Sequence, residues 1–237
     1  MESFKKDQVR TNDGSFTIRH PVYDEEFHSK TGARRETEDL YMKASGYAAC
    51  LAERQEALGV LDVGLGLGYN ALMTLELWMK GEGLCDLTML SLEHTEALLE
   101  ALVAPDTAWK EGWSENWKTW SLTLIKTGGG WQSRFQHPMT NKVFVWNVAV
   151  IDAVHADLSE YRFHFIWQDA FSSKKNPELW TVEWFAKVAA AAASDVCLAT
   201  YSVARLVRDN LEGAGWRPQK IAASGEKKQW LIAHLGE

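Results

Sequence analysis

A glycine-rich bend follows an acidic residue early in the chain. Asp62 lies near the end of a short apolar run, which is followed by Gly64, Gly66 and Gly68 in a Gly-x-Gly-x-Gly arrangement. Glycines allow tight backbone angles and close approach of a ligand to the main chain, and a helix that begins there offers free N–H donors. The pattern predicts a cofactor loop at the carboxyl edge of a parallel sheet.

The spacing of the glycines favours one kind of cofactor. Dinucleotide-binding folds prefer GxGxxG, whereas here the third glycine, Gly68, comes one residue early and Tyr69 follows it. With Asp62, the bend resembles motif I of S-adenosylmethionine-dependent methyltransferases. In such a site Glu93, at the end of the next apolar run, would accept hydrogen bonds from both ribose hydroxyls. NAD binding and a purely structural turn are the alternatives.

A second acidic residue, Asp169, ends another apolar run and precedes a polar loop. An acid at this end of a strand points into the ligand crevice of a doubly wound sheet. A primary alkylamine has a pKa of ~10, so it arrives protonated, and methylation needs its free lone pair. A nearby carboxylate can orient the amine and take its proton, while positioning lowers the barrier further. Asp169 is therefore the predicted catalytic residue; the alternative is a capping or surface carboxylate.

These groups require a fold that brings strand ends together. Short apolar runs alternate with helical patterns, and the expected strands are residues 58–63, 87–93, 163–167, 196–200, 217–222 and 229–234. The expected helices are residues 36–56, 69–80, 95–103, 177–193 and 203–214. This alternation predicts an α/β fold with a mostly parallel sheet, helices on both faces and an antiparallel strand pair at the C-terminal end.

Two regions depart from the alternation. Residues 1–56 are expected to form an N-terminal extension, with an edge strand at 15–19 and an entry helix, before the main domain at 57–237. Residues 105–150 are expected to be an irregular, tryptophan-rich insert. Its four regularly spaced tryptophans either stack a base or pack on the domain, and they are Trp109, Trp113, Trp117 and Trp120.

Composition excludes several classes of protein. The 237 residues are 46% hydrophobic and 24% charged, which is typical of a globular chain. Neither a membrane span nor a signal peptide is expected, and three cysteines without CxxC spacing suggest a reducing cytoplasm. The histidines form no HxxxH pair, so no metal site is expected. The net charge of −7 argues against a protein coated for nucleic-acid binding, although residues 161–237 carry ten basic against eight acidic residues.

The loop after Asp169 also carries a resemblance to a known family. Residues 169–180, DAFSSKKNPELW, resemble the D-G-F-[AS]-P-x-K-N-P-x-[ML]-W signature of the methyltransferase domain of bifunctional tRNA 5-methylaminomethyl-2-thiouridine biosynthesis enzymes (MnmC type). Residues 64–70, 198–202 and 225–229 resemble further motifs of that family, and the similarity spans about residues 23–235.

The resemblance implies a Rossmann-like class I fold, S-adenosylmethionine as cofactor, and N-methylation of the aminomethyl group on the wobble uridine in the anticodon loop of tRNA. It implies that Asp169 is the catalytic carboxylate. The cofactor-binding residues that it implies are Asp62, Gly64, Gly66, Gly68, Asn70, Glu93 and Asp152. The substrate-binding residues that it implies are Glu38, Tyr41, Phe171, Lys175, Asn176, Pro177 and Lys227.

Some positions depart from the family pattern. Ala170 replaces a glycine, Ser173 a proline and Leu67 a threonine. The family's flavin-dependent oxidase half has no counterpart in this sequence, so the expected substrate already carries an aminomethyl group. Two other functions stay open: methylation of a small amine, and a non-catalytic module that binds a nucleoside or a partner. The sequence makes no prediction about oligomeric state.

Overall fold

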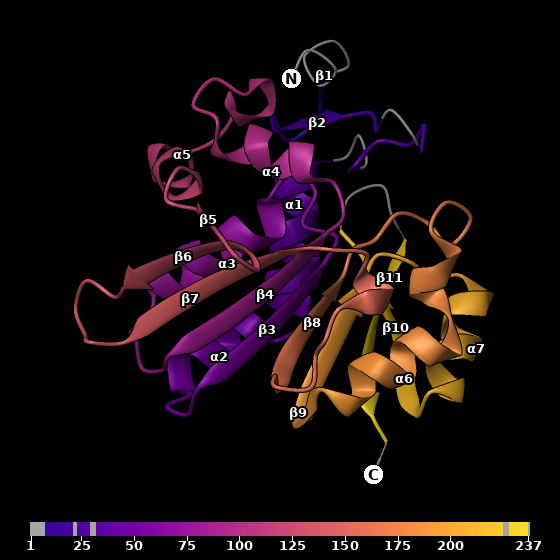
Figure 1. The fold of residues 1–237 in the computed structure, drawn as a ribbon. Coiled ribbons are helices and arrows are strands. Elements are labelled where there is room, and N and C mark those ends of the chain that lie inside the picture. The colour runs from indigo at the N-terminus through magenta and orange to yellow at the C-terminus, as the bar shows by residue number, and fades with distance from the viewer. Residues whose placement is uncertain (1–7, 21–22, 29–31, 225–227, 237) are drawn as a thin grey trace.

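The computed structural model describes residues 8–20, 23–28, 32–224 and 228–236. In this part of the chain a nine-stranded sheet has the order β10-β11-β9-β8-β3-β4-β7-β6-β5 (Figure 1). Its strands are β3 (Leu58–Val63), β4 (Leu87–Glu93), β5 (Ile125–Thr127), β6 (Gly130–Gln136), β7 (Val143–Val150), β8 (Phe163–Gln168), β9 (Ala192–Thr200), β10 (Trp216–Ala222) and β11 (Gln229–Leu235). The five central strands, β9, β8, β3, β4 and β7, are parallel, and antiparallel pairs flank them on both sides.

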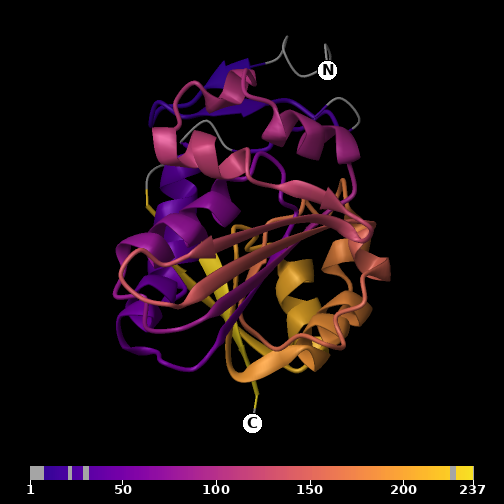
Figure 2. The ribbon, with the colours of Figure 1, turned by 60° about the vertical axis from the view of Figure 1, so that its left-hand side comes forward.

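Helices cover both faces of the sheet, which Figure 2 shows between two helical layers. The longer helices are α2 (Tyr47–Glu53), α3 (Tyr69–Lys80), α4 (Glu96–Val103), α5 (Glu115–Ser121), α6 (Val182–Ala190) and α7 (Arg205–Gly213). The short ones are α1 (Ala33–Glu36) and the 3₁₀ turns η3 (Ala108–Lys110), η4 (Ala153–His155) and η5 (Pro177–Trp180), while η2 (Thr37–Ala44) is a π-helix. The predicted α/β architecture is therefore confirmed.

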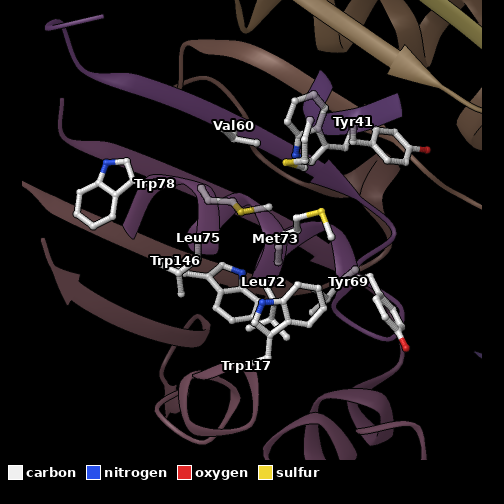
Figure 3. Packing of buried hydrophobic residues seen from close by; sticks show 14 of the residues in the cluster. Tyr41, Val60, Tyr69, Leu72, Met73, Leu75, Trp78, Trp117 and Trp146 are labelled. Carbon is white, nitrogen blue, oxygen red and sulfur yellow. The ribbon is translucent and has the colours of Figure 1, made fainter. Parts of the chain in front are cut away.

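Strand alternation divides the core into two layers. On β3, Val60 belongs to the cluster that contains α3, whereas its neighbour Leu61 belongs to the cluster that contains α6 and α7. Successive strand residues point to opposite faces, so each parallel strand supplies both layers. Figure 3 shows the α3 layer, where Leu72 lies in one cluster with Trp117 and Trp146.

The predicted boundaries agree closely with the structure for the elements around the glycine bend. The helix expected at 69–80 and the strand expected at 87–93 have those bounds, and the C-terminal strands β10 and β11 pair antiparallel as predicted. The helix expected at 177–193 is divided: a 3₁₀ turn precedes α6, and β9 begins at Ala192.

The expectation that residues 105–150 are irregular is wrong. Besides η3 and α5, this segment contains the β5–β6 hairpin and β7, which continues the parallel sheet beside β4. The reason lies in β7, where the alternation of partly exposed and buried residues is that of a strand with one face on the core. Phe144, Trp146 and Val148 are the buried members.

The tryptophan stripe packs on the domain rather than forming a stacking surface. Trp109, Trp113 and Trp117 are buried, and the ring centroids of Trp113 and Trp117 each lie 5.9 Å from that of Tyr69 in α3. Trp117 also donates a hydrogen bond from Nε1 to Glu76 at 2.8 Å. These contacts fix α5 against α3, directly behind the glycine bend.

The N-terminal segment lies over the carboxyl ends of the sheet strands (Figure 1). It contains a separate two-stranded sheet, β1 (Gln8–Arg10) and β2 (Phe16–Ile18), the latter at the edge strand expected at 15–19. Ile18 packs in the same hydrophobic cluster as α3. The division of the chain at residue 57 stays a prediction. Within the described residues, no helix combines the length and the apolar character needed to cross a bilayer.

Candidate active site

A cavity of about 510 Å³ opens at the carboxyl ends of the parallel strands. Its wall includes residues that follow successive strands: Gly64 after β3, Glu93 at the end of β4, Asp169 after β8 and Tyr201 after β9. Loops at this edge of a doubly wound sheet form its ligand crevice. The volume is in the range of ~300–1,000 Å³ that small-molecule sites occupy.

The glycine bend forms one wall because it carries no side chains. Gly64 has a φ of +88°, and a Cβ there would lie 3.0 Å from the carbonyl oxygen of Asp169. Gly66 also has a positive φ, and its N–H donates to Oε2 of Glu93 at 3.1 Å. These two glycines line the cavity as predicted. Gly68 lies outside the described wall: it begins α3 in a left-handed conformation, and a Cβ there would lie 3.1 Å from Leu102.

Glu93, at the end of β4, lines the cavity. Its side chain is buried, and besides the Gly66 bond it accepts the backbone N–H of Thr95 at 2.9 Å on Oε1. These two bonds fix the carboxylate at the cavity wall while each oxygen keeps a lone pair for a ligand. The predicted residue Asp152, after β7, also lines the cavity, and its carboxylate accepts the N–H of Val154.

Asp62 does not line the cavity. It is fully buried beneath the bend, where Ser91, its neighbour across the β3–β4 pair, donates a hydrogen bond to Oδ2 at 2.9 Å. Burial raises the pKa of Asp62 to about 7, although the hydrogen bond from Ser91 acts to lower it. Its strand position turns the side chain into the α3 layer, so the structure gives it no direct contact with a ligand in this cavity.

Two side chains hold the Asp169 carboxylate. Tyr41 donates its hydroxyl proton to Oδ1 at 2.7 Å, and Asn70 donates from Nδ2 to Oδ2 at 2.8 Å. Thr37 in turn donates to Oδ1 of Asn70 at 2.8 Å, which fixes the orientation of the amide. Asn70 was expected at the cofactor and Tyr41 at the substrate, yet both are buried outside the described wall and contact Asp169 instead.

The environment of Asp169 favours its protonated form. Burial raises the pKa of Asp169 to about 8, and the charge of Glu36 acts in the same direction. The hydrogen bonds from Tyr41 and Asn70 oppose this rise because they stabilise the carboxylate. A carboxyl group with such a pKa can exchange a proton near neutral pH.

A π-helix supplies two members of this network. In η2, the N–H of Ser45 bonds to the carbonyl of Leu40, five residues earlier. The wider turn carries Thr37 and Tyr41, which contact Asn70 and Asp169 respectively. π-Helical turns are rare in proteins, and those that do occur often lie at functional sites. The sequence predicted a helix here but gave no signal for this geometry.

The remaining substrate residues divide into two groups. Phe171 and Asn176 line the cavity, whereas Lys175 and Pro177 are exposed and lie outside the described wall. Glu38 is also outside it. Its carboxylate lies 2.7 Å from Nζ of Lys43, because the helical turn directs it to solvent. Lys227 lies outside the residues that the structure describes.

The N-terminal segment contributes aromatic residues that the sequence analysis did not assign to the site. His20, Tyr23 and Phe27 line the cavity with Phe171, and the ring centroid of Phe171 lies 4.8–5.2 Å from each of the other three. Phe27 lies against the bend, since a Cβ on Gly66 would be 3.0 Å from its ring. His20, Tyr23 and Phe27 are thus aromatic residues of the wall that the N-terminal segment supplies.

The charge of the cavity wall is strongly negative. Its acidic members in the described part of the chain are Glu25, Glu26, Glu36, Glu93, Asp152, Asp169 and Glu178. Among those wall residues Arg19 carries a guanidinium, and it forms an ion pair with Asp24 at 2.7 Å. Opposite charges attract most strongly away from water, so this wall suits a cationic ligand. The described residues contain no cluster of three or more side chains able to hold a metal ion.

The chain is similar to known proteins of one kind. A family model described as S-adenosyl-L-methionine-dependent methyltransferase matches residues 114–236. The bifunctional protein MnmC of tRNA 5-methylaminomethyl-2-thiouridine biosynthesis is 26% identical over 225 residues in Paraburkholderia phymatum and 28% identical over 222 residues in Azoarcus sp.. These alignments cover 91% and 89% of this chain but 33% of each relative, so the chain spans about a third of their length.

Solved structures show the same architecture. The crystal structure of MNMC2 from Aquifex aeolicus is 25% identical, with a TM-score of 0.78 over 99% of this chain and 72% of that one. Human methyltransferase-like protein 13, solved in complex with SAH, has a TM-score of 0.52 at 15% identity, over 85% of this chain and 82% of that one. The second similarity concerns the fold alone.

Proposed function

The chain belongs to the S-adenosyl-L-methionine-dependent methyltransferases, and on that premise we propose that it methylates the nitrogen of a 5-aminomethyl group on the wobble uridine of tRNA. The single observation that carries the proposal is the Asp169 carboxyl group, fixed by Tyr41 and Asn70 at the wall of an acidic cavity beside the glycine bend. An enzyme of this kind would work in the cytoplasm.

The residues of the wall fit S-adenosylmethionine. The bend at Gly64 and Gly66 leaves room for a ligand to lie on the main chain, Glu93 offers carboxylate oxygens to ribose hydroxyls, and Asp152 lies at the next loop, beside the proposed adenine position. When bound, S-adenosylmethionine supplies a methyl group on a positively charged sulfur. The negative wall stabilises that charge.

Asp169 performs the proton chemistry. The acceptor amine, with an ordinary pKa of about 10.4, must lose a proton before its lone pair can attack. Transfer to a carboxyl group with a pKa of about 8 costs roughly 3 kcal/mol, against roughly 9 kcal/mol for an ordinary aspartate. Tyr41 and Asn70 fix the carboxylate, so an amine that binds it has one orientation relative to the bend.

Several features support a tRNA substrate. The relatives MnmC are named for tRNA 5-methylaminomethyl-2-thiouridine biosynthesis. The aromatic residues around Phe171 offer ring faces to a base, and an anticodon base can enter such a pocket without melting a helix. Exposed basic residues follow the adjacent strands β8 and β9 outside the acidic cavity: Lys174, Lys175 and Arg205. These side chains could contact RNA phosphates.

A small amine is the second candidate substrate, and the acidic cavity favours it. Seven acidic residues line the described wall, and its negative charge repels a polyanion while it attracts an amine. For a tRNA substrate, the aminomethyl group alone would enter the cavity and the phosphates would stay outside it.

The deciding experiment compares the two substrates directly. Purified protein is incubated with labelled S-adenosylmethionine and with either tRNA carrying 5-aminomethyluridine or a set of small primary amines. The proposal expects 5-methylaminomethyluridine in the digested tRNA, detected by mass spectrometry. In cells lacking the gene, the wobble uridine should lack this methyl group. Methylation of free amines alone would exclude the tRNA role. Failure to bind S-adenosylmethionine below about 1 mM in calorimetry would leave only a non-catalytic module.

A further inference from the structure

We infer that Glu36 is a specificity-determining residue, which together with Asp169 binds the positively charged amine of the substrate. This inference rests on the proposed function, because it names the feature of the acceptor that the cavity recognises. Both residues line the same cavity. The family resemblance implied a substrate role for Glu38, two residues further along, and not for Glu36.

The position of Glu36 is fixed relative to Asp169 by its neighbours in the chain. It is the last residue of α1, and the next residue, Thr37, donates to Asn70, which donates to Asp169. Tyr41, one turn later, bonds the other oxygen of the same carboxylate. The backbone that carries Glu36 is therefore connected to both oxygens of Asp169 through direct side-chain contacts.

The electrostatic effects of Glu36 indicate where its charge lies. Burial is the main cause of the raised pKa values of Asp169, Tyr41 and Tyr201, and the charge of Glu36 raises each of them further. Tyr201 lines the cavity and donates its hydroxyl proton to the carbonyl of Ala170, next to Asp169. Glu36, Asp169 and Tyr201 all line this cavity, and Glu36 is itself partly buried, so the two carboxyl groups lie in the wall of one site.

Two carboxyl groups at one place suit an ammonium ion. A primary ammonium has three N–H donors, and each carboxylate can accept one of them. When the amine is activated, one N–H bond breaks, the proton bonds to an oxygen of the pair, and the electron pair stays on nitrogen. A bound ammonium stabilises the charged form of Asp169, so the pair carries two negative charges in the complex. The ammonium becomes neutral as the pair goes from two negative charges to one, so the total charge is unchanged. A neutral hydroxymethyl group in the same position would gain none of this attraction.

Glu38 provides a matched control. Its carboxylate has the same chemistry and belongs to the same helical segment, but it is half exposed and pairs with Lys43 at 2.7 Å. The substitutions Glu36→Gln and Glu38→Gln remove the same charge two residues apart and keep the shape of the side chain. Only the first removes it from the cavity.

The test measures binding, with S-adenosylhomocysteine present, of two anticodon stem-loop RNAs that differ only in the wobble base: 5-aminomethyluridine or 5-hydroxymethyluridine. We expect Glu36→Gln to weaken binding of the amine RNA about 10- to 100-fold, as expected for a lost charged hydrogen bond, with little change for the hydroxymethyl RNA. Glu38→Gln should change neither. Carbon-13 NMR titration of the carboxyl groups, with Asp169 assigned through Asp169→Asn, should show a lower Asp169 pKa in Glu36→Gln only.

The outcomes separate this inference from the proposed function. If the wild-type protein binds neither RNA, the tRNA substrate is wrong and the inference falls with it. Suppose instead that the wild type binds the amine RNA, and that Glu36→Gln weakens the binding of both RNAs equally or of neither. Glu36 then does not recognise the ammonium, although the proposed function stands. An unchanged Asp169 pKa in Glu36→Gln would likewise overturn the pairing of the two carboxyl groups.

Discussion

Asn70 donates a hydrogen bond to Asp169 at 2.8 Å, and this bond joins the helix that follows the glycine bend to the loop that follows β8. The proposed cofactor wall and the proposed catalytic carboxylate are therefore connected by a direct side-chain contact. Because Thr37 fixes the amide of Asn70 from the other side, the N-terminal segment takes part in the same contact. Three regions of the chain thus determine the position of one carboxyl group.

The substitution Asp169→Asn should abolish methyl transfer but not cofactor binding. An amide cannot take the amine proton, so we expect a loss of activity of at least about 100-fold. The affinity for S-adenosylhomocysteine, measured by calorimetry, should stay within about threefold, because the cofactor wall is formed by other residues. Activity equal to that of the wild type would remove Asp169 from the mechanism.

The substitution Tyr41→Phe should shift the pH dependence of the reaction. The lost hydroxyl stabilises the charged form of Asp169, so the pKa of Asp169 should rise and the alkaline shift should be visible in the pH–rate profile. Tyr47→Phe is the matched control, because Tyr47 is equally buried but donates to the carbonyl of Thr74. Both variants should lose about 1 kcal/mol of unfolding free energy. Identical pH profiles for the two would contradict the positioning role of Tyr41.

The contribution of Asp169 to the stability of the unliganded protein should fall as the pH rises from about 4 to about 8. The pKa of Asp169 is about 8 in the folded state against 3.8 ordinarily, so the folded state binds more protons in this interval. Asp169→Asn removes that dependence. Relative to the wild type, its unfolding free energy should increase between pH 5 and pH 8, by up to about 4 kcal/mol, and level off above pH 8. Denaturant titrations at several pH values measure this, and a constant difference between the two proteins would refute the raised pKa.

The substitution Gly64→Ala should impair cofactor binding beyond its effect on the backbone. Gly64 has a φ of +88°, and a Cβ would lie 3.0 Å from the carbonyl of Asp169. Gly46 has a φ of +85° with no atom within 4 Å of such a Cβ, so Gly46→Ala measures the conformational cost alone, roughly 1–2 kcal/mol. We expect both variants to be destabilised but only Gly64→Ala to bind S-adenosylhomocysteine at least about tenfold more weakly. Similar affinities in the two variants would show that the bend does not contact the ligand.

The sequence by itself determined the elements of the fold and the position of Asp169. Apolar runs of strand length alternating with helical patterns are local signals. They predicted β3, α3, β4 and β8 because the pattern of apolar residues within each element reflects which of its side chains are buried. The glycine spacing was visible for the same reason, since three positive φ angles within five residues require glycine. β7 was missed because it follows a hairpin instead of a helix, although its alternation was present.

Only the tertiary structure decided which side chains reach the cavity. Glu36 and Glu38 differ by two positions on a helix, which turns one into the cavity and the other toward Lys43. Asn70 and Tyr41 carry residue types suited to ligand binding, yet they contact Asp169, which is 99 and 128 residues away in the chain. Contacts over such separations depend on how the N-terminal segment docks on the sheet, and no local pattern in the sequence records that docking.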